Sequence, residues 1–431
     1  MKREKIGVLA DDLTGAMDAG MQVLSSGLRC AVAVGDRLPE NCDVLVYDTE
    51  SRNVSDARVR TEHAAKALLQ ANIPLCYKKI DSTLRGHVGA EIGALLDLAL
   101  ISRVLVAPAL PQSGRTTVGG VHYVFGVPLE QTELAKDPFA PVTTSDIGAL
   151  IHQGCDYPTA LLPLDVVQNG VDAAKKALEA LFESAPIVVA DALTQADLQT
   201  LALAAPEGTL LCGSAGLFTY LPDRLGRMGA PQRTETSACD QPVLALCGSP
   251  AKRSKAQMAR VCKAAQTVDL LAEDLPEIRE KTVYARVDAG ALAQDALETA
   301  AERAVNAVQK LLLRGCNVCM DLSGAGKEEL AAAFAGEEAA LREASGRVQL
   351  LAQKLAKGLW AHYGALVIFG GDTALSVLSA LGCGAVNVLG ACEPLIPKGK
   401  MAGGLADGKW IVTKAGGFGS ENTLLNILSQ F

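Results

Sequence analysis

The sequence lacks both of the common nucleotide-binding motifs. No segment matches the phosphate-binding loop GxxxxGK[ST], and none matches the dinucleotide fingerprint GxGxxG. The first absence excludes a P-loop nucleotide site, and the second argues against a Rossmann dehydrogenase. Any nucleotide site in this chain would have to be built from other glycine turns.

Long apolar runs and basic clusters are also missing. No window approaches the roughly 18 uninterrupted apolar residues that a membrane helix needs. The first ten residues contain only a short apolar run before Asp11 and Asp12, which is unlike a secretion signal. Lys and Arg number 40 against 48 Asp and Glu, a net charge of -8 without a basic block, so nothing marks a nucleic-acid surface. We expect a cytoplasmic protein that binds neither membranes nor nucleic acid.

Paired cysteine motifs are scarce although the chain has 12 cysteines. Without a secretion signal, these residues are expected to be reduced thiols rather than a disulfide framework. The one CxxC, Cys316–Cys319, lies in an apolar, strand-like stretch and has no second pair to match it. We interpret it as buried structural thiols rather than as a metal or redox site.

Aromatic residues make up only 4% of the chain, whereas hydrophobic residues make up 49% and glycine occurs 41 times. This composition is typical of α/β layers with buried parallel strands. A length of 431 residues favours two domains of roughly 200 residues each over a single core.

Short apolar runs alternate with helical patterns along most of the chain, which predicts βαβ units and mostly parallel sheets. In the first half we expect strands at 6–10, 29–34, 44–47, 75–79, 104–107, 187–190 and 210–213, with helices at 16–25, 56–72, 91–100, 171–184 and 194–205. In the second half we expect strands at 243–247, 268–271, 283–287, 318–322, 366–369, 386–389 and 410–413, with helical patterns at 291–313, 330–340 and 340–363.

The segment 222–241 interrupts this alternation, because it is polar and rich in Gly and Pro, as expected of a linker. We therefore predict two domains, 1–230 and 240–431. Each is expected to be a mostly parallel sheet flanked by helices.

Two adjacent carboxylates, Asp11 and Asp12, follow the first predicted strand. In open α/β sheets, ligands bind beyond the carboxyl ends of the strands. Such a pair can accept hydrogen bonds from substrate hydroxyls, coordinate a metal, or include a general base. The structural alternative is that one of the two only caps the following helix.

A second polar cluster follows the strand at 75–79. Residues 78–87 read Lys-Lys-Ile-Asp-Ser-Thr-Leu-Arg-Gly-His, which places cations, an acid and two hydroxyls at a strand end. Lys and Arg donate charge-assisted hydrogen bonds to carboxylates or phosphates, and Asp81 and Ser82 suit hydroxyl groups. A solvated loop is the alternative, but we favour a binding site.

Two further arginines are candidate anion contacts. Arg52 follows the strand at 44–47, and Arg115 lies in a loop, 108–120, that Pro and Gly punctuate and that continues to Asp137 and Pro138. Long loops in compact domains are often lids or binding loops. For Arg115, a plain surface position is an equally good reading.

The second half contains three glycine turns that each follow a predicted strand. They include Ser249 in the first turn, Gly370, Gly371, Asp372 and Thr373 in the second, and Gly416 and Gly417 in the third. Glycine permits close approach of the backbone to phosphates, and the amides at a helix start attract anions. One such turn is weak evidence of a phosphate site, but three in one domain are strong.

Taken together and in this order, these segments resemble the four-carbon acid sugar kinases over nearly the full length. The resemblance rests on the residues at 10–16, 78–86, 108–116, 370–373 and 414–419. It implies a sugar-acid-binding N-terminal domain and a nucleotide-binding C-terminal domain, with the active site in the cleft between them. The implied activity is transfer of a phosphoryl group from ATP, with Mg²⁺ bridging phosphates, to the terminal hydroxyl of a small sugar acid.

The resemblance also implies which residues take part. Substrate contacts fall on Asp11 or Asp12, on Arg52 and on Lys79, Ile80, Asp81 and Ser82, and ATP contacts fall on Ser249, Gly370, Gly371, Asp372, Thr373 and Gly416. From the residues themselves we add Arg85 to the substrate contacts and Gly417 to the ATP contacts. Asp11 or Asp12 is the expected base, with Asp12 favoured because it lies beside a helix start. His87 is the rival base.

Three questions stay open at this point. The substrate is threonate or erythronate, with a 3-oxo-tetronate as the alternative. A non-catalytic sugar-acid-binding protein of the same fold is the alternative from another class, which the acids and glycine turns of both halves disfavour. The sequence does not decide the oligomeric state, a homo-oligomer included.

Overall fold

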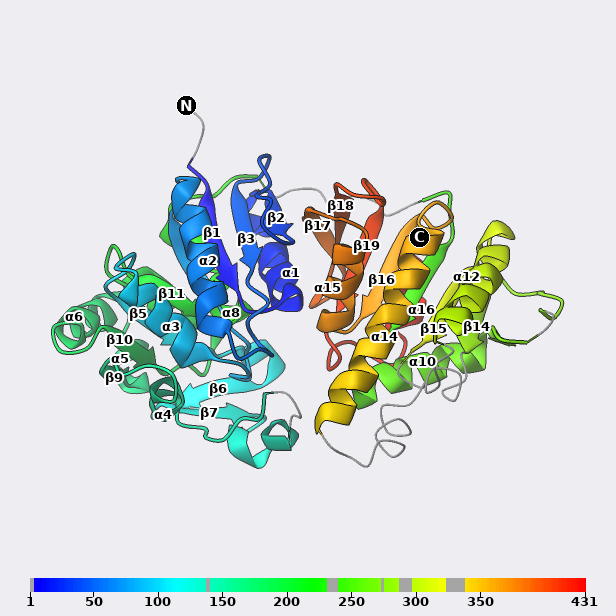
Figure 1. The fold of residues 1–431 in the computed structure, drawn as a ribbon. Coiled ribbons are helices and arrows are strands. Elements are labelled where there is room, and N and C mark those ends of the chain that lie inside the picture. The colour runs from blue at the N-terminus through cyan, green and yellow to red at the C-terminus, as the bar shows by residue number, and fades with distance from the viewer. Residues whose placement is uncertain (1–3, 137–139, 231–238, 273–274, 287–296, 323–337) are drawn as a thin grey trace. The chain divides into compact units, whose positions relative to one another are not determined.

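The chain folds into two units of alternating strands and helices (Figure 1). The computed structural model describes residues 4–136, 140–230, 239–272, 275–286, 297–322 and 338–431. The units are Met1–Gln232 and Arg233–Phe431. Four expected features lie outside the described residues, namely Asp137–Pro138, the middle of the linker (231–238), the start of one helical pattern (291–296) and most of another (330–337).

The first unit contains an eight-stranded sheet in which every described pairing is parallel. Most of its short strands are buried, which explains why they read as apolar runs in the sequence. The edge strand at 159–162 is only partly buried and was not expected. Their spatial order is β2 (Cys30–Ala33), β3 (Val44–Asp48), β1 (Ile6–Ala10), β4 (Leu75–Lys79), β11 (Leu210–Gly213), β5 (Val104–Ala107), β10 (Ile187–Ala190) and β9 (Thr159–Leu162).

Strand order and right-handed crossovers place the helices of this unit on two faces. From β1 the chain moves toward β2, but from β3 it moves toward β4, so the connecting helices α1 and α2 must lie on opposite faces. One face carries α2 (Ala57–Gln70), α3 (Val88–Asp97) and α4 (Ile147–His152). The other carries α1 (Leu13–Gln22), α5 (Leu164–Gln168), α6 (Val171–Leu181), α7 (Gln195–Ala204) and α8 (Ala215–Phe218), and α9 (Leu221–Arg224) follows and contacts α7.

The loop expected over 108–120 is in fact partly strand, which corrects the sequence interpretation. It leads into an antiparallel sheet of β6 (Arg115–Val118), β7 (Val121–Val124) and β8 (Val127–Pro128). Gly119 and Gly120 join the first two strands, with φ of 61° and 74°. A Gly-Gly pair between β-branched residues is a two-residue hairpin signal, because such turns need positive φ at both positions.

The second unit also has an eight-stranded sheet, parallel except for one strand. Its order is β13 (Gln266–Asp269), β14 (Thr282–Arg286), β15 (Asn317–Asp321), β12 (Val243–Cys247), β16 (Ala365–Phe369), β19 (Trp410–Lys414), β18 (Ile396–Ala402) and β17 (Ala385–Glu393). The expected fold class, an α/β protein with mostly parallel sheets flanked by helices, is confirmed. Strand β18 was not expected; it contains Pro397 and Gly399, which are unfavourable in strands. It runs antiparallel to both neighbours.

The helices of the second unit again divide by the direction of the crossover. On one face lie α12 (Leu297–Leu313), α14 (Glu338–Leu359) and α15 (Gly371–Ala380), which pack side by side. On the other lie α10 (Lys252–Ala264) and α16 (Thr423–Leu428), which contact each other. In the part of the chain that the structure describes, no helix is both long and apolar enough to cross a membrane.

Candidate functional sites

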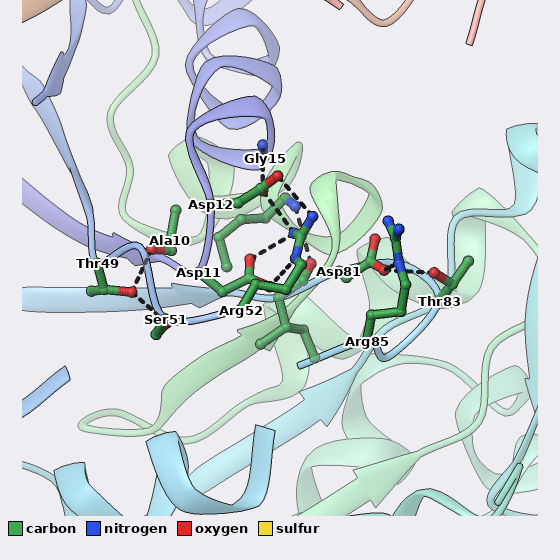
Figure 2. Close-up of polar contacts among 12 residues, drawn as sticks. Ala10, Asp11, Asp12, Gly15, Thr49, Ser51, Arg52, Asp81, Thr83 and Arg85 are labelled. Carbon is green, nitrogen blue, oxygen red and sulfur yellow. Dashed lines mark hydrogen bonds and ion pairs between the residues drawn. The ribbon is translucent and has the colours of Figure 1, made fainter. Parts of the chain in front are cut away.

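The acid cluster predicted in the first unit is assembled at the carboxyl ends of three neighbouring strands. Strands β3, β1 and β4 lie side by side, so the residues that follow them meet at one edge of the sheet. Figure 2 shows the result, with the Arg52 guanidinium lying between the carboxylates of Asp11 and Asp12. Asp81 and Arg85 form a neighbouring pair.

Arg52 binds both adjacent aspartates at once. Its Nε and Nη2 donate to the two oxygens of Asp11 at 2.7 and 3.0 Å. Its Nη1 and Nη2 donate to the two oxygens of Asp12, each at 2.7 Å. The planar fork of arginine suits such bidentate pairing, so one cation fixes the orientation of both carboxylates.

Local backbone geometry explains how these three side chains meet. Asp12 has an extended backbone and caps α1, because its Oδ1 accepts the Gly15 amide at 2.8 Å. The Asp11 carbonyl accepts the amides of Ser51 and Arg52, at 3.0 and 3.2 Å, which ties the loop after β3 to the end of β1. The capping alternative therefore applies to Asp12, alongside its ion pair rather than in place of it.

The two aspartates differ in exposure and in pKa. The side chain of Asp12 is 18% exposed, against 3% for Asp11. Burial pushes the pKa of Asp11 up, but the Arg52 guanidinium, Lys78 and Lys79 outweigh it and leave that pKa lowered. For Asp12, burial and the negative charge of Asp11 together leave the pKa raised despite Arg52. Asp12 is thus the more accessible and the more basic of the two.

The consecutive lysines of β4 point in different directions, as alternation along a strand requires. Lys78 is fully buried, and its Nζ lies 3.1 Å from a carboxylate oxygen of Glu91 on α3. Glu91 also accepts a hydrogen bond from the hydroxyl of Ser51. Lys79 turns to the face that α1 covers, close to Gly15, where its Nζ donates to the Ile80 carbonyl at 3.0 Å.

The remaining predicted residues of the cluster divide into polar and apolar positions. Arg85 Nε donates to Asp81 at 2.6 Å, and the Thr83 hydroxyl donates to the same oxygen. Burial pushes the pKa of Asp81 up, but Arg85 and Arg52 outweigh it and hold that pKa far below its usual range. Ile80 instead packs in the hydrophobic core, so only its backbone faces polar groups.

Arg115 opens β6 near this cluster. Burial lowers its pKa, and the charges of Asp81 and Arg85 also act on it. One of its nitrogens donates to the Ser113 carbonyl at 2.7 Å. His87, the rival base, is exposed at the start of α3, and its imidazole shows no contact with the two aspartates among the described residues.

Sequence reasoning missed a buried histidine in contact with the cluster. His122 of β7 places Nε2 2.9 Å from the Ser82 carbonyl and Nδ1 3.0 Å from the Thr117 hydroxyl. A carbonyl only accepts, so Nε2 carries the proton and Nδ1 accepts from Thr117. Burial lowers the pKa of His122 to about 4, which keeps the ring neutral. The overlooked signal was the Gly-Gly hairpin that directs this strand back to residue 82.

Sequence reasoning also missed the buried carboxyl of Asp48 at the end of β3. Its Oδ1 accepts the Glu50 amide at 3.0 Å, whereas its buried Oδ2 has no hydrogen-bond partner among the described residues. Burial and the charge of Asp12 raise the pKa of Asp48, which favours the protonated form. The buried position of this carboxyl could not be read from its place after an apolar run, because loop acids follow such runs equally often.

The three glycine turns of the second unit meet at one edge of its sheet. They follow β12, β16 and β19, which are neighbours. A Cβ on Gly248 would clash with Thr373, and one on Gly416 would clash with Ser249, so these contacts require glycine. Gly370 has a φ of 112° and its amide donates to the Lys414 carbonyl at 3.0 Å. The structure therefore brings together all three segments that the sequence singled out.

This edge offers amide groups to an anion. Among the hydrogen bonds of the described residues, none uses the amides of Ser249, Gly416 or Gly417 as donors. Gly371 and Asp372 lie in the first turn of α15, where the helix dipole is positive. Backbone amides at a helix start and in glycine loops are suited to bind phosphates.

The fit of a magnesium ion can be tested on the available carboxylates. Within the described residues, no group of three or more His, Cys, Asp or Glu side chains could hold a metal on its own. Magnesium usually keeps several waters and binds one or two carboxylates together with substrate phosphates. The exposed Asp372, beside the glycine turn, suits that manner of binding.

Two family models match separate parts of the chain. A family model described as "Sugar-binding N-terminal domain" matches residues 6–221, and one described as "Nucleotide-binding C-terminal domain" matches residues 244–424. The fold resembles a crystal structure described as the putative tRNA synthase from Salmonella typhimurium LT2, with a TM-score of 0.80, 23% identity and 99% of each chain covered. At that identity the likeness concerns the fold alone.

Three curated relatives cover almost the whole chain. The D-threonate kinase of Salmonella typhimurium is 33% identical, over 98% of this chain and 97% of the relative. The D-erythronate kinase of Heliobacterium modesticaldum is 31% identical, over 96% and 94%. The 3-oxo-tetronate kinase of Pseudomonas savastanoi pv. phaseolicola is 27% identical, over 99% and 97%.

The chain is thus a two-domain α/β protein of the class that couples a sugar-binding domain to a nucleotide-binding domain. Within that class, it belongs to the four-carbon acid sugar kinase family. The resemblance found in the sequence is confirmed.

Proposed function

We propose that the protein transfers the γ-phosphoryl group of ATP to the terminal hydroxyl of D-threonate or D-erythronate. It is a kinase of four-carbon sugar acids, a phosphotransferase with an alcohol group as acceptor. The observation that carries the finer proposal is the Asp11–Asp12–Arg52 cluster, because it holds an accessible carboxylate in a fixed orientation at a strand end.

The acid is bound by cations and hydroxyl partners of the first unit. Among described residues, the Lys79 ammonium makes one hydrogen bond, to the Ile80 carbonyl, so it keeps donors for a ligand carboxylate. Arg85 and Arg115 add positive charge beside Asp81. Arg52 differs, because its guanidinium already binds two carboxylates; its role is to orient Asp11 and Asp12 and to contact the acid from that position.

The chemical step is displacement at the γ-phosphorus. The terminal hydroxyl oxygen attacks, a new O–P bond forms, the bond to the β–γ bridging oxygen breaks, and ADP leaves. Asp12 accepts the hydroxyl proton, since its carboxylate is more accessible than that of Asp11 and its pKa is raised. A base whose pKa lies nearer to the working pH transfers protons more effectively.

ATP is held by the glycine turns of the second unit. The amides of Ser249, Gly416 and Gly417 and the start of α15 at Gly370–Thr373 receive the phosphates. Magnesium, held by Asp372 and the phosphates, would neutralise part of their charge. Charge stabilisation and positioning are most of what phosphoryl transfer requires of a protein.

A coupled assay of ADP release tests this proposal. The panel is D-threonate, L-threonate, D-erythronate, L-erythronate and the 3-oxo-tetronate, each with ATP and Mg²⁺. Turnover with D-threonate or D-erythronate at the highest kcat/KM supports the proposal. Preference for the 3-oxo acid would favour the second candidate function, that of a 3-oxo-tetronate kinase. One relative with that name is 27% identical to this chain. Acid binding without ADP release would indicate a non-catalytic sugar-acid-binding protein.

A further inference from the structure

A buried lysine lies directly behind the third glycine turn. Lys414 is the last residue of β19 and is 1% exposed. Its Nζ lies 2.8 Å from the Ala415 carbonyl, 3.1 Å from that of Phe418 and 3.3 Å from that of Gly416. It also lies 3.4 Å from the Ser254 hydroxyl and 4.6 Å from the centre of the Phe369 ring. One ammonium thus gathers three carbonyls of a single loop.

Two side chains of α10 hold the same loop from the same side. The Ser254 hydroxyl donates to the Gly416 carbonyl at 3.1 Å. The Gln257 amide donates to the carbonyls of Phe418 and Ser420 at 3.1 and 2.7 Å. Both side chains are fully buried. The carbonyls of residues 415, 416, 418 and 420 are therefore held by side chains of the protein itself.

Because the peptide bond is planar, the direction of each carbonyl also fixes the direction of the amide that follows it. In a trans peptide, the C=O of one residue and the N–H of the next point in opposite directions. Because the carbonyls of residues 415, 416 and 418 point to Lys414, the amides of Gly416, Gly417 and Gly419 point away from it. None of these three amides donates a hydrogen bond within the described residues.

We propose that Lys414 is a positioning residue for the nucleotide phosphates. It turns the amides of the 415–419 loop away from itself and places a positive charge behind them. This inference rests on the proposed function. A neutral side chain could not replace the ammonium, because three carbonyl oxygens converge on it and only a charged amine offers three donors from one atom.

The surroundings of Lys414 make its charge sensitive to pH. The pKa of the ammonium is lowered to about 8, mainly by burial; Cys247 of β12 raises this pKa and Arg253 of α10 lowers it. Ser254 and Phe369, which also face it, do not titrate. Since bound phosphates favour the charged form, ATP affinity should fall as the pH rises through about 8, by up to tenfold per pH unit.

The first test is calorimetric ATP binding by the full-length protein. Lys414→Met should raise the Kd for ATP at least tenfold and leave the Kd for the acid unchanged. Lys409→Met is the matched control, because Lys409 also donates to a backbone carbonyl, that of Tyr363 at 2.7 Å, and lies over an aromatic ring, but it precedes β19 at the opposite end. An unchanged Kd for ATP in Lys414→Met would overturn the inference.

The second test separates positioning by charge from a purely structural role, and it stands even if Lys414→Met does not fold. The Kd for ATP of the wild type is measured between pH 7 and 9.5, together with that of Lys414→Arg, whose guanidinium stays charged over this range. A rise in the wild-type Kd above about pH 8 that is absent from Lys414→Arg supports the inference. A flat wild-type profile overturns it. Failure of the wild type to bind ATP at any pH would instead refute the proposed function.

Discussion

The two candidate sites lie at equivalent edges of two similar sheets, but one consists mainly of side chains and the other mainly of backbone. In the first unit the polar groups are side chains, and their charges largely pair with one another, as Arg52 does with Asp11 and Asp12. In the second unit the polar groups without a partner among the described residues are backbone amides, in loops that buried side chains such as Ser254 and Gln257 hold from behind. The contrast matches the ligands, since an acid with several hydroxyls needs distinct partners, whereas a chain of phosphates needs repeated N–H donors.

The largest effect should come from removing the basic carboxylate of the first site. Asp12→Asn should lower kcat by about 10²–10⁴-fold, because the amide cannot accept the hydroxyl proton. Asparagine caps helices as well as aspartate does, so α1 should be retained. Steady-state kinetics check this, with His87→Ala as the control that should cost much less. Near wild-type kcat in Asp12→Asn and in Asp11→Asn, together with a loss in His87→Ala, would reverse the roles.

The consecutive lysines of β4 provide the next comparison, because one is structural. Lys78→Met leaves the buried Glu91 without its cation, which typically costs about 3–5 kcal/mol of unfolding free energy. The double variant Lys78→Met/Glu91→Leu should recover most of that loss. Urea denaturation of the two variants and the wild type measures both effects. A stable Lys78→Met with an increased KM for the acid would instead make Lys78 part of the binding site.

A smaller effect on the free energy of unfolding is expected from His122, whose ring donates to the Ser82 carbonyl. Its pKa is about 4 in the folded protein, against the ordinary 6.5. Below pH 6.5 the unfolded chain binds a proton that the folded protein does not, so stability should fall as the pH drops from 6.5 to 4, by roughly 3 kcal/mol from this group. Denaturation of the wild type and of His122→Gln over this range isolates the contribution. Equal slopes in the two proteins would show that His122 is not buried in its neutral form.

Sequence patterns predicted most of the parallel strands, because strands such as those at 6–10 and 365–369 are short, fully buried apolar runs bounded by turn residues. They missed the edge strand β9, which is only partly buried. Patterning failed where burial and composition disagree. Strand β18 carries Pro397, Gly399 and two lysines, yet it lies between two partners. Sequence motifs also located both clusters but could not separate Lys78 from Lys79, since only the position of α3 shows which face of β4 holds Glu91.

Some expectations stay predictions because no observation of the structure or of the relatives bears on them. These are the boundary between the domains at 230–240, the cytoplasmic location, the oligomeric state and the individual roles of the site residues. Lys79 is the clearest example among the residues, because its ammonium makes one hydrogen bond among the described residues, to a backbone carbonyl. Removing one charged hydrogen bond between Lys79 and the carboxylate of the acid would cost about 1.5–3 kcal/mol of binding free energy, or roughly one to two decades of affinity.

The central claim is that side chains of the first unit bind the acid and backbone of the second unit binds ATP. Calorimetry of both ligands on two variants tests it directly. Gly417 is suitable because a Cβ there would meet nothing within 4 Å, so Gly417→Val should fold normally and yet obstruct the phosphates. The account predicts that Gly417→Val raises the Kd for ATP about tenfold or more and leaves the Kd for the acid unchanged. Lys79→Met should raise the Kd for the acid and leave the Kd for ATP unchanged. The reverse pattern, or an unchanged Kd for both ligands in either variant, would contradict it.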